Sequence, residues 1–416
     1  MDVIEAADKH VMIISRIAFR NIFRQKRRSL LTALMMAGGT ALFAISLGIS
    51  EGSYANLIDM FTRDHTGHIQ IHKRGYLDKP SLYNTLKHPD AQGLKIQNLP
   101  HVQAWAPRVY SPALAFIGKK TTGVRIIGVH PQREGATTRL KRKLRKGRFI
   151  SNGPIEEVII GGGLVEILKA DLGDEIALIA QAADGSVANE LFKVVGVVSD
   201  GGDAYERMNC YMHIQRAQEF LVLPNRVHEL AVVLTDQSKA EGVAKVIQAT
   251  LDDNALHIAP WQVVEKQFYQ AMQADIEGMW ISLTIIMIIV AIGVLNTVLM
   301  TILERTREFG VLRAVGTKPR DVFKLIVLET AYLSILSVVL GGAVGLIGNY
   351  ILSRHGITLP TPIEYGGVQF DKMIGVISFQ TLWMPAAVTF LTAIVVSVFP
   401  ALRAAKVTPV KAMRTH

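Results

Sequence analysis

The chain has a single cysteine, Cys210, among its 416 residues. An intrachain disulfide is therefore impossible, and a zinc site built from four cysteines is excluded. Charged residues are also few, at 19% of the chain against about 25% in an average soluble domain. Half of the residues are apolar, and the mean hydropathy of +0.28 is high for a cytosolic protein. This composition excludes a disordered chain, which needs low hydrophobicity and high net charge.

The sequence also lacks a nucleotide-binding loop and a recognisable catalytic arrangement. A P-loop needs the pattern G-x-x-x-x-G-K-[ST], but Gly118 lacks the upstream glycine and the run 161–163 lacks the lysine. His68 and His72 share one face of an expected strand, where about 13 Å of strand rise separates them, too far to share a metal ion without bending. We therefore expect no metal, no cofactor and no catalytic residue in this chain.

Long apolar runs are abundant. A transmembrane helix needs about 20 mostly apolar residues, and four runs satisfy this condition: 29–50, 278–303, 330–353 and 373–402. Core helices of soluble proteins are rarely apolar on all sides over such lengths, so we predict four transmembrane helices. The first run is longer than the apolar part of a signal peptide and has no A-x-A cleavage site, so we expect it to be retained.

The basic residues predict the orientation of these helices. Segments 1–28, 304–329 and 403–416 carry excess positive charges of 4, 2 and 4, which together equal the net charge of +10. Such segments stay on the cytoplasmic side, so we predict that both termini are cytoplasmic and that 51–277 and the short loop 354–372 face outward. The basic excess then reflects topology, and no nucleic-acid partner is expected.

Residues 1–28 are predicted to form a cytoplasmic amphipathic helix. Arg16, Arg20 and Arg24 recur every fourth residue, and isoleucine and phenylalanine cover much of the remaining surface. A basic, aromatic-containing helix is suited to the headgroup layer of a bilayer. A plain charged leader is the alternative.

The outward segment 51–277 mixes strand and helix patterns. Strands are expected at 68–72, 102–117, 124–129, 158–163, 175–181, 192–198 and 230–234, and helices at 164–169, 214–221 and 239–251. The piece at about 148–208 is mainly β and is predicted to form a sub-domain. Residues 54–63 continue the first helical pattern, and a helix from Pro260 to Leu303 would be about 66 Å long. Both helices would project from the membrane as stalks.

Two further features leave alternatives open. Residues 139–148 contain seven basic residues in ten, either as a solvated loop or as a contact for anionic headgroups or an acidic partner. Small residues in membrane helices let backbones approach closely. We therefore predict a packing face on the third span, formed by Gly341, Gly342, Gly345 and Gly348.

The loop between the second and third spans begins with the sequence ERTREFGVLRAVG at 304–316. Its spacing is typical of a short charged helix that ends at Gly316. By spacing alone, this helix is either a solvated connector or a docking element for a cytosolic partner.

This loop resembles the cytoplasmic loop of FtsX/MacB-like ABC transporter permeases. Residues 18–32 and 399–414 resemble that family's entry to the first span and its C-terminal signature. The resemblance implies an α-helical integral membrane protein of the bacterial inner membrane. The resemblance further implies four transmembrane helices, with a large α+β periplasmic domain of porter and sabre-like sub-domains inserted between the first two. It also implies a coupling helix that places Glu304, Arg305, Arg307, Glu308 and Arg313 at the surface of a cytosolic ATPase dimer, with Phe309 as apolar anchor and Gly316 as cap.

Within that family, size and layout are closest to the lipoprotein-releasing (LolC/LolE-type) permeases. The implied function is to couple ATP hydrolysis, with ATP and magnesium bound by the partner ATPase, to extraction of lipoproteins or other amphipathic substrates from the outer leaflet. A second permease copy or paralogue and a periplasmic carrier are implied partners. A signalling permease that regulates a cell-wall hydrolase, and a MacB-like efflux permease with a separate ATPase, are the alternatives. Substrate-binding residues are not identified.

Overall fold

The computed structural model describes residues 2–24, 26–198, 206–365 and 368–407. The chain forms two compact units. The membrane unit comprises residues 1–54, 273–358 and 372–416, and the extramembrane unit comprises residues 55–272 and 359–371.

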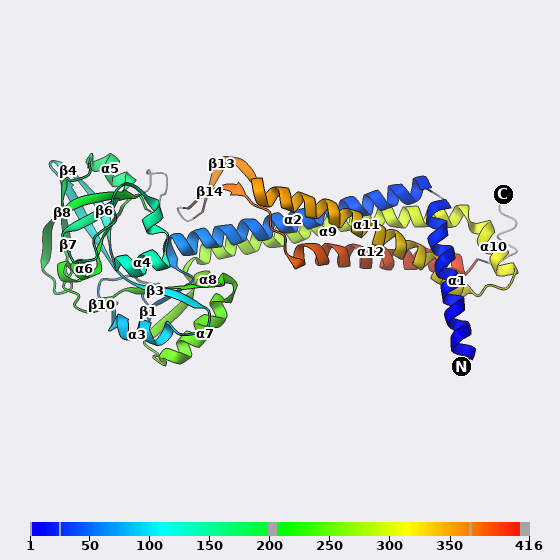
Figure 1. Cartoon of the computed structure of the whole chain (residues 1–416), viewed down its shortest axis with the longest axis horizontal. Coiled ribbons are helices and arrows are strands. Elements are labelled where there is room, and N and C mark those ends of the chain that lie inside the picture. The colour runs from blue at the N-terminus through cyan, green and yellow to red at the C-terminus, as the bar shows by residue number, and fades with distance from the viewer. Residues whose placement is uncertain (1, 25, 199–205, 366–367, 408–416) are drawn as a thin grey trace. The chain divides into compact units, whose positions relative to one another are not determined.

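Four helices are long and apolar enough to span a membrane (Figure 1). They are α2 (Lys26–Phe61), α9 (Lys266–Glu304), α11 (Pro319–His355) and α12 (Phe379–Ala405). Two shorter helices complete the membrane unit, α1 (Asp2–Arg24) and α10 (Thr306–Ala314). Local sequence sets their ends: Pro319 occupies the first turn of α11, and Ser378 and Thr381 form a capping box at the start of α12. The predicted four-helix class is confirmed.

Helices α2 and α11 pack along a seam of small residues. A Cβ atom added at Gly345 would lie 2.7 Å from the Cβ atom of Ala44, and one at Gly348 would lie 2.8 Å from Ile45. Gly341 faces Ala37 and Thr40 of α2 in the same way. The prediction that Gly342 belongs to the packing face is wrong, because a Cβ atom added at Gly342 meets nothing within 4 Å. A helix turns about 100° per residue, so Gly342 points away from the seam that Gly341 joins.

We expect Gly345→Leu to destabilise the membrane unit and Gly342→Leu to leave it unchanged. A leucine at position 345 must push α2 and α11 apart, and overpacking of this kind costs about 1–3 kcal/mol. The thermal stability of the purified chain in detergent measures the difference. Gly342→Leu is the matched control, and equal melting temperatures of the two variants would show that the seam is not close-packed in solution.

The extramembrane unit is built on a ten-stranded sheet. The strand order is β12-β1-β11-β3-β4-β9-β6-β8-β5, with β7 hydrogen-bonded to both β3 and β8. The strands are β1 (Ile69–Lys73), β3 (Val102–Ile117), β4 (Lys120–Val129), β5 (Leu144–Gly147), β6 (Glu157–Gly161), β7 (Glu175–Gln181), β8 (Val187–Val198), β9 (Asn209–His213), β11 (Glu229–Leu234) and β12 (Leu256–Pro260).

Short helices and two two-stranded sheets complete the fold. The helices are α3 (Pro89–Ile96), α4 (Pro131–Thr137), α5 (Gly162–Leu168), α6 (Ile214–Phe220), α7 (Ala240–Leu251) and α8 (Trp261–Val264), with single turns at Thr62–Thr66, Leu140–Lys143 and Gln237–Lys239. The two-stranded sheets pair β2 (Leu86–Lys87) with β10 (Arg226–Val227), and β13 (Ile357–Tyr365) with β14 (Val368–Met373).

The strand pairing closes a barrel inside this sheet. The strands β3, β4, β9, β6, β8 and β7 are each paired with the next, and β7 pairs again with β3. The predicted β-rich sub-domain at about 148–208 is therefore not a separate sheet. It shares the 16-residue strand β3, whose first part pairs with β11 and whose later part pairs with β7.

One further expectation from the sequence is corrected. The run from Pro260 to Leu303 is not one helix, because α8 ends at Val264 and Glu265 leaves helical geometry at φ −100° and ψ 50° before α9 begins. In the basic run 139–148, five of the seven basic residues are exposed, as in a solvated segment, and some basic residues of the run form ion pairs within the chain. Arg139 pairs with Asp59, and Arg148 pairs with Glu157.

Candidate coupling site

Helix α10 is a nine-residue segment of the membrane unit that ends in a well-formed cap. Gly316 has a φ of +104°, the left-handed conformation that the sequence predicted. The N–H of Thr317 donates to the carbonyl of Leu312 at 3.0 Å, and the N–H of Gly316 donates to that of Arg313 at 3.2 Å. This pair of bonds is a Schellman motif, and it turns the chain towards α11. The Arg313 side chain adds a bond to the carbonyl of Thr317 at 3.0 Å.

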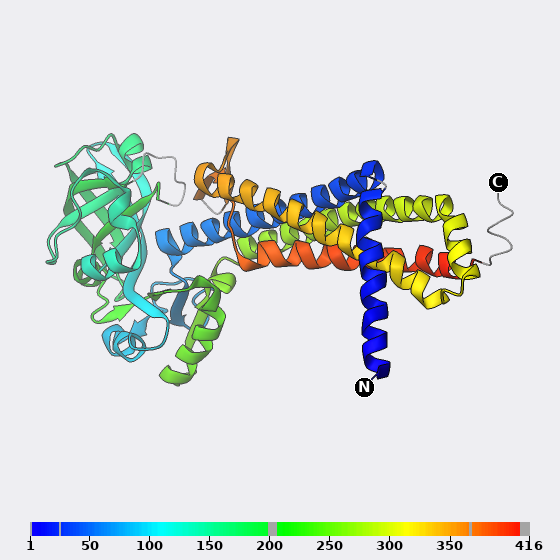
Figure 2. The same ribbon diagram turned by 45° about the vertical axis from the view of Figure 1, so that its right-hand side comes forward.

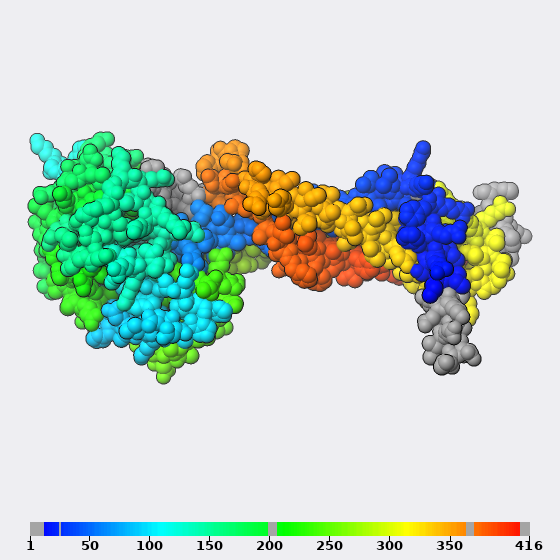
Figure 3. Space-filling view, in the orientation of Figure 1, coloured from blue at the N-terminus to red at the C-terminus, as the bar shows by residue number. Residues whose placement is uncertain are grey.

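Phe309 lies in the core of the membrane unit. Its side chain is 1% exposed, and it belongs to a cluster with residues of α1, α11 and α12: Ile14, Ala18, Val322, Leu325, Ile326, Ala401 and Ala404. Helix α1 crosses the start of α11 in both ribbon views (Figure 1 and Figure 2). The two helices are in contact along this crossing (Figure 3). The expectation of Phe309 as an anchor for the ATPase is therefore wrong, because α1 and α12 already cover this side chain.

A chain of charges fastens α1 and α10 to α11. Glu308 lies 3.0 Å from Arg24 of α1 and 3.0 Å from Arg305. The guanidinium of Arg305 also donates to both oxygens of Glu329 in α11, at 3.0 and 3.2 Å. Asn21 donates to the same carboxylate of Glu329. Because each charge in this network has a partner of opposite sign, the network can hold α10 in a fixed orientation.

Three of the residues expected at the ATPase surface form ion pairs within the chain, and one of them, Arg305, is buried. Arg305 is only 9% exposed, Glu308 is shared between Arg24 and Arg305, and Glu304 pairs with Arg28. The sequence showed the charges of Glu304 and Glu308 but not their partners, because Arg24 and Arg28 lie more than 270 residues away along the chain. Arg307 is exposed, as expected.

The exposed side of α10 and its C-cap residue Val315 carry apolar side chains that were not expected at the site. Val311 and Leu312 are exposed, and Val315 is 84% exposed. Together with Arg307 they form what we call the α10 strip. The available signal was that α10 has more apolar residues than one packing face needs.

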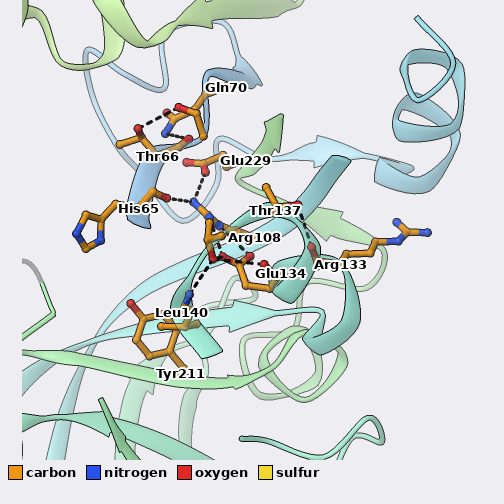
Figure 4. A network of polar contacts seen from close by, with 12 residues as sticks. His65, Thr66, Gln70, Arg108, Arg133, Glu134, Thr137, Leu140, Tyr211 and Glu229 are labelled. Atoms are coloured by element: carbon orange, nitrogen blue, oxygen red, sulfur yellow. Dashed lines mark hydrogen bonds and ion pairs between the residues drawn. The ribbon is translucent and has the colours of Figure 1, made fainter. Parts of the chain in front are cut away.

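A second ionic network lies in the extramembrane unit, around Arg108 of β3 (Figure 4). Arg108 is buried and makes two bonds to Glu134 of α4, at 2.7 and 3.1 Å. It also donates to Glu229 of β11 at 2.9 Å and to the carbonyl of His65 at 2.5 Å. Burial opposes the charge of Arg108, but its two carboxylate partners raise its pKa well above the usual value. Arg108 thus joins the turn that follows α2 to two strands and a helix.

His65 lies beside a further buried carboxylate. Its Nδ1 atom lies 3.2 Å from Glu206, and Lys143 lies 3.3 Å from the same carboxylate. Burial alone would raise the pKa of Glu206, but its bonds and charge contacts with His65, Lys143 and Tyr211 lower it to about 2. Glu206 is therefore ionised at neutral pH, and it ties the turn after α2 to the barrel strand β9 through Tyr211.

Two family models match the chain. Residues 29–250 match the MacB-like periplasmic core domain, and residues 280–409 match the FtsX-like permease C-terminal region. The chain belongs to the FtsX/MacB-like family of ABC transporter permeases. The four apolar helices and the first match indicate a bacterial inner-membrane protein with a periplasmic domain.

Relatives of this chain carry different names. One is the lipoprotein-releasing system transmembrane protein LolC of Neisseria meningitidis, 24% identical over 76% of this chain and 79% of the relative. Another LolC, from Xylella fastidiosa, is 26% identical over 76% of this chain and 78% of the relative. The macrolide export ATP-binding/permease protein MacB 2 of Aeromonas hydrophila is 23% identical over 96% of this chain but only 60% of its own length.

Among solved structures, the periplasmic region of MacB from Actinobacillus actinomycetemcomitans is similar in fold. The alignment covers 48% of this chain and 92% of the MacB chain. The TM-score is 0.36 and the sequence identity is 15%.

Proposed function

We propose that this permease couples ATP hydrolysis by a separate cytosolic ABC ATPase dimer to movement of its extramembrane unit. ATP and magnesium would be bound by the ATPase, and this chain would supply no cofactor site. The observation that carries the proposal is the α10 strip. Three exposed apolar side chains stand on a helix whose other face is fixed by a buried aromatic core and by ion pairs. A rigid helix of this kind can transmit displacement, whereas a solvated connector would bend.

The substrate that we propose is a lipoprotein or another lipidated or amphipathic molecule at the outer leaflet. The similarity to proteins named lipoprotein-releasing over three quarters of the chain supports this class. We also propose a second permease copy or paralogue as partner, with a periplasmic carrier that accepts the substrate. Exposed isoleucines along α9, including Ile281, Ile285, Ile288 and Ile292, offer a surface for that second copy or for lipid.

Reconstitution of the chain with its ATPase and a lipoprotein in vesicles tests this function. ATP-dependent release of the lipoprotein to a soluble acceptor is the expected result. Permease-stimulated ATP turnover without release would instead favour a signalling permease, and turnover stimulated by a macrolide would favour efflux.

Val315→Asp is expected to uncouple the ATPase without affecting folding. Val315 is almost fully exposed, so the substitution removes no internal contact, and it places a charge in the proposed interface. Loss of a central interface residue often costs about 2 kcal/mol or more, which is roughly a thirtyfold loss of affinity. Co-purification of the ATPase measures the effect. Val187→Asp, at a valine that is 74% exposed in β8, is the control, and normal ATPase binding by Val315→Asp would eliminate the α10 strip as the contact.

We also propose that both termini and α10 are cytoplasmic. A cysteine introduced at Ser186 or Asn254 should react with an impermeant thiol reagent in spheroplasts, and one at Lys318 should react only after lysis. All three positions are exposed. The native Cys210 gives little background, because it is fully buried and burial raises the pKa of its thiol to about 12. Labelling at position 318 in intact spheroplasts would reverse the orientation.

A further inference from the structure

The extramembrane unit contains a cleft of about 630 Å³, within the range of small-molecule sites. It opens where β3 leaves its partner β11 and meets its next partner β7. The last β3 residue paired with β11 is Arg108, and the first paired with β7 is Leu114. Between them, Tyr110, Ser111 and Pro112 line the cleft.

The edge of β3 at this point offers no free backbone N–H donor to another strand. The N–H of Tyr110 donates to Nδ1 of His228 at 3.0 Å, and Pro112, the next residue that faces the same way, has no N–H. An incoming strand would therefore find no free donor at either position. Recognition in this cleft must come from side chains.

The lining combines aromatic and apolar side chains with polar and charged ones. Tyr76 stacks on the ring of His72, with centroids 4.8 Å apart and planes 14° apart. Tyr110 lies under the guanidinium of Arg125, at 5.5 Å from its centroid. Tyr83 is 56% exposed. Apolar side chains also line the cleft: Leu77, Pro80 and Leu82 from the loop between β1 and β2, and Val264 from α8.

The charged side chains that line the cleft are one cation, the Arg125 guanidinium over the Tyr110 ring, and two carboxylates, Glu229 and Glu265. Only one of the two carboxylates is paired with a cation. Glu265 lines the cleft, and among the described residues the Glu265 side chain makes no hydrogen bond or ion pair. Burial raises its pKa, while the nearby His65 opposes the rise. The other carboxylate, Glu229, is already paired with Arg108 at 2.9 Å. Burial lowers the pKa of His72 to about 4, so this ring adds no positive charge at neutral pH.

We propose that this cleft binds an amphipathic organic cation. Its apolar or aromatic body would lie against the tyrosines and prolines, and its protonated amine would face Glu265. Aromatic faces attract cations as well as apolar groups, and an ammonium group supplies both the charge and the hydrogen bonds that Glu265 lacks. The site goes beyond the proposed function and does not require an ATPase.

The cleft also touches both chain segments that connect the extramembrane unit to the membrane helices. Thr66 ends the turn that follows α2, and Glu265 immediately precedes α9. A ligand bound between them would therefore contact the roots of both stalks.

Binding of the cationic dye rhodamine 6G to the full chain in phosphatidylcholine nanodiscs tests the site, with fluorescence polarisation as readout and empty nanodiscs subtracted. We expect saturable binding that Glu265→Gln weakens about tenfold, the usual effect of losing a hydrogen bond to a charged group. Tyr83→Ala, at an exposed position, should weaken it severalfold. Glu241→Gln, at an exposed glutamate of α7, is the control and should bind as the wild type does.

The anionic dye fluorescein has the same ring system and provides the charge control. It should show no saturable binding. The proposal is overturned if rhodamine 6G binds no better than to empty nanodiscs, if Glu265→Gln leaves its affinity unchanged, or if fluorescein binds equally well. None of these outcomes depends on ATP turnover, so the proposed coupling function is tested separately.

Discussion

Phe309→Ala is expected to release α10 from the membrane unit and to abolish coupling. Removing a fully buried phenylalanine costs about 3–5 kcal/mol, and here the lost contacts are those that join α10 to α1, α11 and α12. The Arg305 guanidinium lies 5.2 Å from the centroid of the Phe309 ring. Loss of the ring therefore also removes a contact that positions Arg305, so we do not expect its ion pairs to hold the helix alone. We expect rapid proteolysis of the 304–318 segment and loss of permease-stimulated ATP turnover.

Phe399→Ala is the matched control for this experiment. Phe399 lies near the C-terminal end of α12, the end that packs around Phe309 through Ala401 and Ala404. Phe399 is itself exposed, so its loss removes little packing. If Phe309→Ala resists protease and stimulates the ATPase as well as Phe399→Ala does, then the core around Phe309 does not position α10.

Helix α10 shows how much of a site can be predicted from sequence. The segment, its charges and its glycine cap were all visible in the sequence, and Gly316 has the predicted backbone conformation. The direction of each side chain was not visible, because α10 has apolar residues on two faces and spacing alone does not say which face is packed. The structure decides this through Ile14 and Ala18, which pack in the same core as Phe309. Val315 is left outside.

The strands were more predictable than the architecture that they build. Strand β3 covers Val102–Ile117 and β7 covers Glu175–Gln181, the same bounds that alternation and turn residues indicated. Closure of the barrel was not predictable, because β3 pairs with β7 across a separation of more than 60 residues. Local patterns carry no information on such pairing, and the choice depends on which apolar faces bury each other.

The second large effect is expected at Arg108. Arg108→Met leaves Glu134 and Glu229 buried in the extramembrane unit without their shared cation, and removing one partner from a buried ionic network costs about 3–5 kcal/mol. Hydrogen exchange of β3 and β11 peptides in the full chain measures the local opening free energy. The cost should shrink as pH falls, because burial already raises the pKa of Glu229 despite Arg108. A carboxylate with a raised folded-state pKa takes up a proton on acidification, and the unpaired charge disappears.

Two comparisons separate this effect from a general loss of an arginine. Arg207→Met removes an exposed pair with Glu166, which lie 3.2 Å apart, and exposed pairs are typically worth about 0–1 kcal/mol. The triple variant Arg108→Met/Glu134→Gln/Glu229→Gln removes all three charges and should recover much of the stability, since the penalty comes from unpaired charge and not from the absence of a salt bridge. If Arg108→Met exchanges no faster than Arg207→Met at pH 7, then the buried network does not hold β3, β11 and α4 together.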